Sequence, residues 1–261
     1  MKVFVDPYMD RKNGLLKNTL NITDRDTLNR AEAHYTSLNM REMVQNPIEG
    51  KFDFAHLCKI HEAIFKDVYE WAGSPRIINI EKPERVLGGL SVEYTECDEI
   101  QREANMILTK MNATDWNKLT LDEKAVEFSK HMADLWKVHP FREGNTRTTV
   151  TFCCDFADSN GFGLDRNLFK DNSEYMRDAL VAASAKFSDI GDHSQPEHLY
   201  KIVKDSMERG EKARQAEKGE KNASTMGMSA WKDAVNSPAQ GIGQTGRENI
   251  VEQAVDEAER S

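Results

Sequence analysis

Apolar residues recur at helical spacing over most of the chain, and this pattern predicts a protein built from α-helices. Thr23 or Asp24 can cap the first of these helices, and Asn46-Pro47 ends it. Seven helical segments are expected in all. They lie near residues 24–45, 53–68, 98–111, 120–138, 145–160, 172–185 and 196–209.

One stretch departs from the helical pattern. Residues 76–82 are rich in β-branched side chains, and a second extended run follows at 90–94, after two glycines. Two such runs around a glycine turn predict a β-hairpin at about residues 77–94. Because a lone hairpin is marginal unless it packs on or pairs with something, it is either a lid or substrate-docking edge, or only a connecting loop. The expected fold class is all-α with this one β-hairpin.

Composition divides the chain into a body and a tail. Residues 6–23 carry turn signals and little periodicity, so we expect an irregular N-terminal arm that wraps the body. Residues 207–222 are almost all charged or small, which fits a solvated helix extension or a linker. We predict one globular domain over 1–205, then a charged linker and mobile tail over 206–261. Within the tail, residues 248–260 have the spacing of a short helix.

Charge and cysteine content exclude several classes of protein. The formal net charge of −9 argues against a general nucleic-acid binder. The four cysteines form no C-x-x-C pair, so free thiols in a reducing cytosol are expected. No apolar run is long enough to span a membrane, and the first residues do not read as a signal peptide. The protein is therefore expected to be cytoplasmic, with no nucleic-acid or membrane partner.

The densest group of chemically useful residues lies between the predicted helices at 120–138 and 145–160. A proline ends the first helix, a short polar loop follows, and the second helix then begins. A helix N-terminus offers unpaired N–H groups and a partial positive charge, so it suits an anion such as phosphate. The stretch reads His139-Pro140-Phe141-Arg142-Glu143-Gly144-Asn145-Thr146-Arg147.

Each polar residue type in this stretch has a use in phosphate chemistry. Gly144 permits close approach of a phosphate to the backbone, and Asn145 can cap the helix or bond a phosphate oxygen. Glu143 is a candidate ligand for Mg²⁺, and Arg147 can pair with a distal phosphate. His139 suits a general base, because the ordinary pKa of histidine is about 6.5.

Two further histidines lie on the helix predicted at 53–68. His56 and His61 do not have the i, i+4 spacing of a helical zinc pair. We interpret them as packing or surface residues.

The loop resembles the signature of the Fic (Fic/Doc) family, H-x-F-x-[D/E]-G-N-x-R, at every fixed position. The similarity extends from residue 6 to about residue 200. It includes Asp6-Pro7-Tyr8, Leu16-Lys17-Asn18, Phe52-Asp53, His56-Leu57, His61, Phe65, Asp67-Val68-Tyr69-Glu70-Trp71-Ala72-Gly73 and Arg76. The resemblance implies a helical bundle with one β-hairpin, the flap, over the active site. It also implies transfer of AMP from ATP to a Ser, Thr or Tyr hydroxyl of a target protein.

The resemblance also implies a role for each loop residue. His139 would deprotonate the target hydroxyl, Glu143 would hold Mg²⁺, and Phe141 would pack into the core and fix the loop. The nucleotide-binding residues would be Gly144, Asn145, Thr146 and Arg147. The flap would pair with the target by strand addition. Its docking residues would be Ile80, Glu81 and Lys82.

Two positions depart from the pattern G-N-G-R-x-x-R, which is common among AMP-transferring relatives. Thr146 places a β-branched side chain where the pattern has glycine, and Val150 removes an arginine. Transfer of another phosphate-containing group, as by a protein kinase, is therefore an alternative, and a non-catalytic binding module is a second. The binding module is disfavoured by the intact residues His139, Glu143, Asn145 and Arg147.

Many relatives carry an inhibitory helix with the motif [S/T]-x-x-x-E-[G/N]. Glu49, Glu143 and Glu248 precede Gly or Asn, but none has Ser or Thr four residues earlier. If the protein is a toxin, we expect its inhibition to come from a separate small antitoxin protein.

Overall fold

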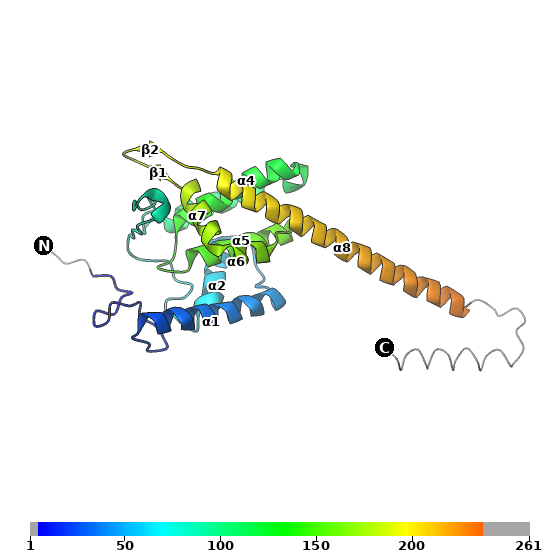
Figure 1. Cartoon of the computed structure of the whole chain (residues 1–261), viewed down its shortest axis with the longest axis horizontal. Helices are drawn as coiled ribbons and strands as arrows, with labels where there is room; N and C mark the ends of the chain where they lie inside the picture. The colour runs from blue at the N-terminus through cyan, green and yellow to red at the C-terminus, as the bar shows by residue number, and fades with distance from the viewer. Residues whose placement is uncertain (1–4, 237–261) are drawn as a thin grey trace, which may run out of the picture. The chain divides into compact units, whose positions relative to one another are not determined.

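The computed structural model describes residues 5–236, with side chains as far as residue 216. This part of the chain contains eight α-helices, two 3-10 helices and one two-stranded antiparallel hairpin (Figure 1). The α-helices are α1 (Arg25–Gln45), α2 (Phe54–Phe65), α3 (Ile100–Ala113), α4 (Leu121–Val138), α5 (Asn145–Ser159), α6 (Arg166–Asp171), α7 (Ser173–Ala183) and α8 (Glu197–Asn236). The other elements are the 3-10 helices η1 (Arg85–Leu87) and η2 (Trp116–Lys118), and the strands β1 (Lys186–Phe187) and β2 (Gly191–Asp192).

Side-chain caps set where several helices begin. Asp24 caps α1 and Asp53 caps α2, each by accepting a backbone N–H of the first turn. Thr120 and Glu123 form a capping box at the start of α4. Of the two residues predicted to cap the first helix, Asp24 is the one that does so. The six-residue helix α6 was not predicted, because it is too short to show a periodic pattern.

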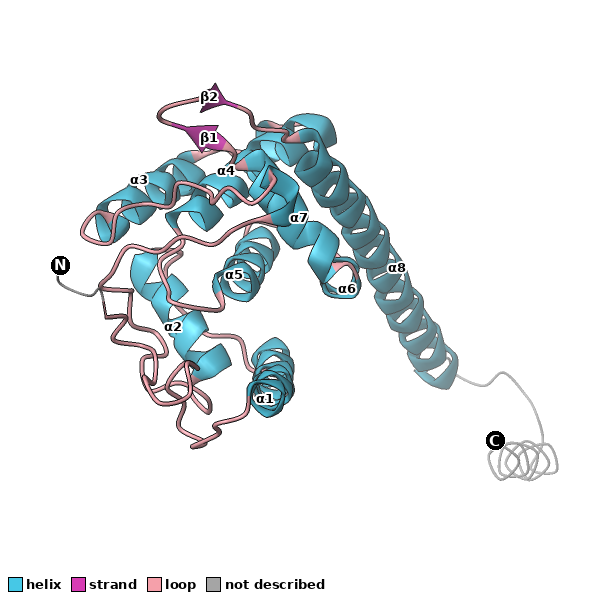
Figure 2. Cartoon of the chain, turned by 60° about the vertical axis from the view of Figure 1, so that its left-hand side comes forward, coloured by secondary structure: helices cyan, strands magenta, loops and turns pink. Residues whose placement is uncertain are grey.

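Helices α2, α4 and α5 form the centre of the body. Helix α2 packs on α1, α3 and α5, and α4 packs on α3, α5 and α7 (Figure 2). The largest fully buried side chains include seven aromatic residues of the core. These are Phe65, Tyr69, Phe128, Trp136, Phe141, Phe152 and Phe156. Because α4 ends and α5 begins inside this core, the loop between them is held at both ends.

The segment predicted as a β-hairpin, residues 77–94, is not a regular hairpin. Its two arms are extended on either side of η1, and covered and exposed residues alternate along 76–84 as they do in a strand. One backbone bond joins the arms beside η1, from the Glu84 N–H to the Leu90 carbonyl (3.0 Å). No ladder follows it, because the Lys82 N–H donates to the Ser91 hydroxyl (3.0 Å) and Pro83 has no N–H. The prediction of strands here is wrong, and the regular hairpin is β1–β2. We call residues 77–94 the flap segment.

Helix α8 continues to Asn236. Composition allowed either a helix or a linker at 207–222, and the structure shows a helix. The first compact unit of the chain ends at Lys212, within this helix, and the domain limit near 205 stays a prediction. The helix predicted at 248–260 lies outside the described residues. Within the described part, no helix combines the length and apolarity needed to cross a bilayer.

A buried arginine joins the flap segment to the end of α4. Arg76 is only 2 % exposed. Its guanidinium donates to the carbonyl oxygens of His139 (2.9 Å), Ile78 (2.7 Å) and Thr95, and its backbone N–H donates to the Pro140 carbonyl (2.7 Å). Burial lowers the pKa of Arg76. One side chain therefore fixes both arms of the flap segment to the loop that follows α4.

Replacing Arg76 with methionine should lower the free energy of unfolding by about 3 kcal/mol, because three buried carbonyls lose their charged donor. Urea denaturation measures this change. The matched control is Arg102→Met, whose side chain is 69 % exposed and makes only surface ion pairs. The control should change stability by less than about 0.5 kcal/mol. Equal stability of the two variants would contradict the structural role of Arg76.

Candidate active site

Two left-handed residues shape the loop between α4 and α5. His139 ends α4 with a φ of 48°, and Gly144 precedes α5 with a φ of 83°. A Cβ atom at Gly144 would lie 2.2 Å from Cζ of Phe65. Glycine is therefore required here by both its backbone conformation and its packing.

The Asn145 side chain holds this loop closed. Its Oδ1 accepts the Phe141 N–H (2.8 Å), and its Nδ2 donates to the Phe141 carbonyl (2.7 Å). The Phe141 ring is fully buried, as expected for a residue that fixes the loop. The sequence allowed Asn145 to cap the helix or to bond phosphate. The Asn145 side chain does not cap the helix, because both of its amide atoms pair with Phe141, and its bond to phosphate stays a prediction.

His61 of α2 supports the acidic end of the loop. Its ring stacks on Phe141, with centroids 3.8 Å apart. Its Nδ1 accepts the Gly73 N–H (2.8 Å), so its Nε2 carries the proton and donates to the Glu143 carbonyl (3.0 Å). Burial lowers the pKa of His61 to about 4, which keeps this tautomer neutral. His61 is a packing residue, as predicted, and it also positions Glu143.

The His139 imidazole is enclosed by aromatic rings. Tyr94 of the flap segment stacks on it at 3.9 Å, and Trp136 meets it edge-on at 5.1 Å. Its Nε2 is buried and has no partner among the described residues. Burial, followed by the positive charge of Lys82, lowers the pKa of His139 well below its ordinary value. The imidazole is therefore neutral at pH 7, with a nitrogen open for a proton.

A buried ion pair supports the ring that covers His139. Glu84 is 2 % exposed, and its carboxylate accepts a hydrogen bond from each terminal nitrogen of Arg177 on α7, at 2.7 and 2.8 Å. Glu84 also accepts the Tyr94 hydroxyl at 3.3 Å. Glu84 and Arg177 thus link the flap segment to α7 and hold Tyr94 against the imidazole.

Glu143 and Lys82 meet across the site. Lys82 Nζ lies 3.3 Å from Glu143 Oε2, while Glu143 Oε1 accepts the Gly144 N–H (3.0 Å). Burial raises the pKa of Glu143, but Lys82, the Gly144 N–H and Arg147 more than offset this, and the pKa lies below its usual value. No group of three metal-ligating side chains exists in the described part of the chain. A metal here would have one carboxylate from the protein.

The other two predicted docking residues flank Lys82 on the flap segment. Ile80 is partly buried and packs against the core, and the Glu81 side chain is exposed. The structure therefore brings Lys82 to the loop and leaves Glu81 on the surface.

The start of α5 leaves three backbone N–H groups without an acceptor inside the helix. The first intrahelical bond runs from the Thr148 N–H to the Gly144 carbonyl (3.1 Å). The N–H groups before it, on Asn145, Thr146 and Arg147, have no intrahelical acceptor. They point out of the helix end, where its dipole is positive, and Glu143 lies immediately before them.

Arg147 is engaged by α1 in this structure. Its guanidinium pairs with Glu32 (2.6 Å), donates to the Thr36 hydroxyl (3.2 Å) and lies over the Phe65 ring at 4.7 Å. Glu32 also accepts the Tyr69 hydroxyl. A phosphate bound by Arg147 would therefore compete with Glu32 for the same cation.

The hydroxyl of Thr146 has a structural partner. The buried indole N–H of Trp136 donates to Thr146 Oγ1 (2.9 Å). Glycine at this position would leave that N–H without an acceptor. Val150 is partly buried against the core, so an apolar residue there is explained by packing.

Sequence reasoning missed four of the residues that shape this site: Glu32, Tyr94, Glu84 and Arg177. None has a local motif, because they reach the loop from α1, the flap segment and α7, all of which lie far from it in the sequence. The sequence around Glu84 gives no signal, and only its burial in the structure shows that this carboxylate requires a partner.

Comparison with known proteins identifies the class of this fold and site. The model of the Fic/DOC family matches residues 51–157. The chain is 33% identical over 166 residues to the Probable protein adenylyltransferase y4lH of Sinorhizobium fredii, covering 62% of this chain and 80% of that protein. The chain therefore belongs to the Fic/DOC family.

Two Bartonella proteins are also similar. The Protein adenylyltransferase VbhT of Bartonella schoenbuchensis is 35% identical over 164 residues, covering 61% of this chain. The aligned part is 32% of VbhT, so the chain spans about a third of that relative. The N-terminal Fic domain of a VirB-translocated Bep effector protein from Bartonella quintana, solved with bound ADP, superposes with a TM-score of 0.63 at 25% identity. That superposition covers 76% of this chain and 93% of the solved one.

Removing the Tyr94 ring should expose the His139 imidazole and raise its pKa toward the ordinary value. The acid limb of the pH–activity profile should then move to higher pH in Tyr94→Ala. A His139 with a higher pKa becomes protonated, and stops acting as a base, at a higher pH. The Tyr94→Phe variant keeps the stacked ring and should retain the wild-type limb. The chemical shift of the His139 ring protons, followed by NMR titration, measures the pKa directly. If the wild type, Tyr94→Ala and Tyr94→Phe all show the same acid limb, then Tyr94 does not lower the pKa of His139.

Replacing Thr146 with glycine should lower the free energy of unfolding by about 1–3 kcal/mol, because the buried Trp136 N–H loses its acceptor. The control is Thr146→Ser, which keeps the hydroxyl and should stay within about 1 kcal/mol of the wild type. Urea denaturation followed by tryptophan fluorescence measures both. Equal losses in the two variants would mean that the methyl group, not the hydroxyl, is what matters.

Proposed function

We propose that this protein transfers AMP from ATP to a hydroxyl side chain of a target protein. One observation carries the proposal: the neutral, buried imidazole of His139 has an unpartnered Nε2 at the end of α4, across a short loop from the unpaired N–H groups of α5. A general base and an anion site are thus combined in one loop.

In the proposed reaction, His139 Nε2 takes the proton of the target hydroxyl. The hydroxyl oxygen bonds to the α-phosphorus of ATP, and the bond from that phosphorus to the oxygen bridging to the β-phosphate breaks. Pyrophosphate leaves with the electron pair. The N–H groups at the start of α5 stabilise the negative charge on the phosphate oxygens, in a site from which aromatic rings exclude water.

Glu143 is the residue that would hold Mg²⁺. Mg²⁺ is commonly bound by one or two carboxylates together with substrate phosphates, and Glu143 is held in its ionised form. When bound, the ion would neutralise part of the phosphate charge. Lys82 could then leave Glu143 and pair with a phosphate, because the carboxylate and the phosphate are both anions that attract its ammonium group.

The flap segment supplies an edge on which a target could dock. Between the Ile77 N–H, which donates to Tyr8, and the Lys82 N–H, which donates to Ser91, the backbone N–H groups of residues 78–81 have no partner in the described part of the chain. An extended target segment can pair with such an edge as an added strand. We call residues 78–81 the docking edge. We also propose that a separate small protein inhibits this one, since the inhibitory motif is not found in the sequence.

The transferred group can be read from the position of a label. Purified protein is incubated with Mg²⁺, a cell lysate, and ATP labelled at either the α or the γ phosphate. The proposal expects protein-bound label from α only, and transfer lower by about 10² to 10⁴ in His139→Ala. Nucleotide binding by that variant, measured by calorimetry, should persist. Label from γ alone would establish phosphoryl transfer instead, and full activity of His139→Ala would remove the base from the mechanism.

A further inference from the structure

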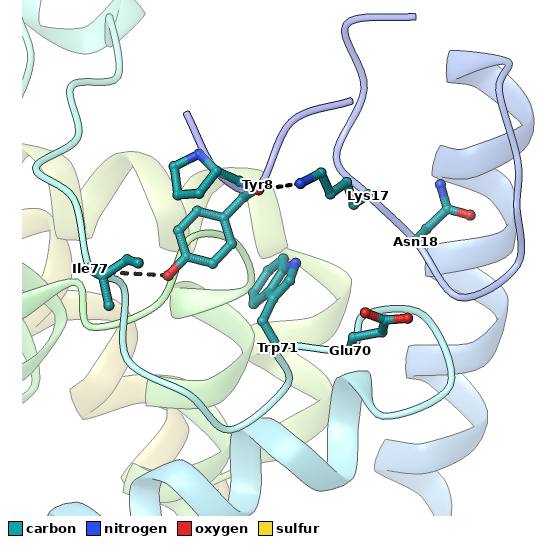
Figure 3. Close-up of a pocket in the computed structure, with 7 residues that line it drawn as sticks. Tyr8, Lys17, Asn18, Glu70, Trp71 and Ile77 are labelled. Atoms are coloured by element: carbon teal, nitrogen blue, oxygen red, sulfur yellow. Dashed lines mark hydrogen bonds between the residues drawn. The ribbon is translucent and has the colours of Figure 1, made fainter. Parts of the chain in front are cut away.

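A cavity of about 450 Å³ lies beside the active-site loop, outside the catalytic groups described above. Its volume is in the range of ligand sites in proteins. Figure 3 shows the rings of Tyr8 and Trp71 in its wall, with Ile77 on one side and Glu70 and Lys17 on the other. The two rings meet edge-to-face, with centroids 5.5 Å apart.

Three walls of this cavity are also connected to the active-site loop. Asp6, two residues before Tyr8, pairs with Arg142 of the loop (2.8 Å). Trp71 stacks on His61, which bonds the Glu143 carbonyl. Ile77 follows Arg76, which bonds the His139 and Pro140 carbonyls. The cavity is therefore fixed rigidly to the residues that hold the proposed base.

The cavity also adjoins the docking edge. The Ile77 N–H, which directly precedes the docking edge, donates to the Tyr8 hydroxyl (3.1 Å). Both residues line the cavity. The Ile77 side chain is 71 % exposed, although it is large and apolar. The chain bends at residues 77–78, and exposed and covered residues then alternate as far as Lys82, so this stretch spans at most about 16 Å at about 3.3 Å per residue. A target strand paired along the docking edge would therefore need about as many residues as the stretch from Ile77 to Lys82 to reach from the loop to the cavity.

The composition of the cavity indicates what it accepts. Two aromatic rings, a proline and Ile77 give it apolar walls. Lys17 and Glu70 place charges of opposite sign on its rim, which favours neither a cation nor an anion. The Trp71 indole N–H has no acceptor among the described residues. These features fit a large uncharged side chain, most of whose surface is apolar.

We propose that this cavity binds a large apolar side chain of the target protein, four to six residues from the modified hydroxyl, while the intervening target segment pairs with the docking edge. The proposal rests on the proposed function, because it takes the target hydroxyl to be at His139. It adds a sequence preference that the catalytic loop does not supply.

The probe is a set of synthetic peptides of 15 residues, each with one central tyrosine as its only hydroxyl side chain and otherwise alanine, glycine and lysine. Single positions from two to seven residues on either side are replaced with leucine, methionine or phenylalanine. Transfer of label from α-labelled ATP is measured for each peptide, with labelling of the protein itself as the reference reaction. We expect a preference of about tenfold in kcat/KM for a large apolar residue four to six positions away on one side.

The test variant is Ile77→Ser, which removes an exposed wall of the cavity and keeps the backbone N–H. The matched control is Leu90→Ser, which removes an exposed aliphatic residue from the other arm of the flap segment, outside the cavity. Ile77→Ser should reduce the preference to about threefold or less while keeping the rate on the peptide that has no apolar replacement. Leu90→Ser should retain the wild-type preference. Circular dichroism confirms that both variants are folded.

The outcomes separate this inference from the proposed function. Label on the protein itself but on no peptide, or peptide transfer with no positional preference, would overturn the cavity proposal and leave AMP transfer in place. A preference that Ile77→Ser and Leu90→Ser reduce equally would also overturn it. If wild-type protein transfers no α label to itself, to lysate or to peptides, the proposed function itself fails.

Discussion

The active-site loop depends on buried side chains that bond its backbone carbonyls. Residues 139–144 have no regular structure, and a buried carbonyl without a donor is costly. Three elements supply the donors: Arg76 bonds the His139 carbonyl, Asn145 bonds that of Phe141, and His61 bonds that of Glu143. Because the donors come from the base of the flap segment, from α5 and from α2, the loop keeps its shape only when these elements are packed together.

Cations around the site are held in pairs with carboxylates. Lys82 pairs with Glu143, Arg147 with Glu32, and Arg177 with Glu84. The last carboxylate is almost fully buried, so this pair is the most firmly fixed, and it supports the ring over His139. The first two pairs have exposed parts, so an incoming phosphate can compete for their cations. A chain with a net charge of −9 can in this way present local positive charge to an anionic substrate.

The departures of this loop from the commoner family pattern have explanations in packing. Thr146 accepts the indole N–H of Trp136, and Val150 packs against the core. Both residues therefore serve the junction of α4 and α5. Neither removes the backbone N–H groups at the start of α5, so these groups do not depend on the glycine and the arginine that the pattern would place there.

The sequence by itself determined the helical class, most helix positions, and the residues of the loop, because periodicity, caps and the signature are local properties of the chain. It also singled out Gly144, for close approach of a phosphate to the backbone, whereas the left-handed conformation that requires glycine there is visible only in the structure. Only the tertiary structure decided how His139 is covered, which carboxylate holds Arg147, and that the flap segment forms no ladder. These depend on contacts between segments far apart in the chain: Tyr94 with His139, Glu32 with Arg147, and Glu84 with Arg177. No local pattern encodes such pairs, because burial and the geometry of packing select them.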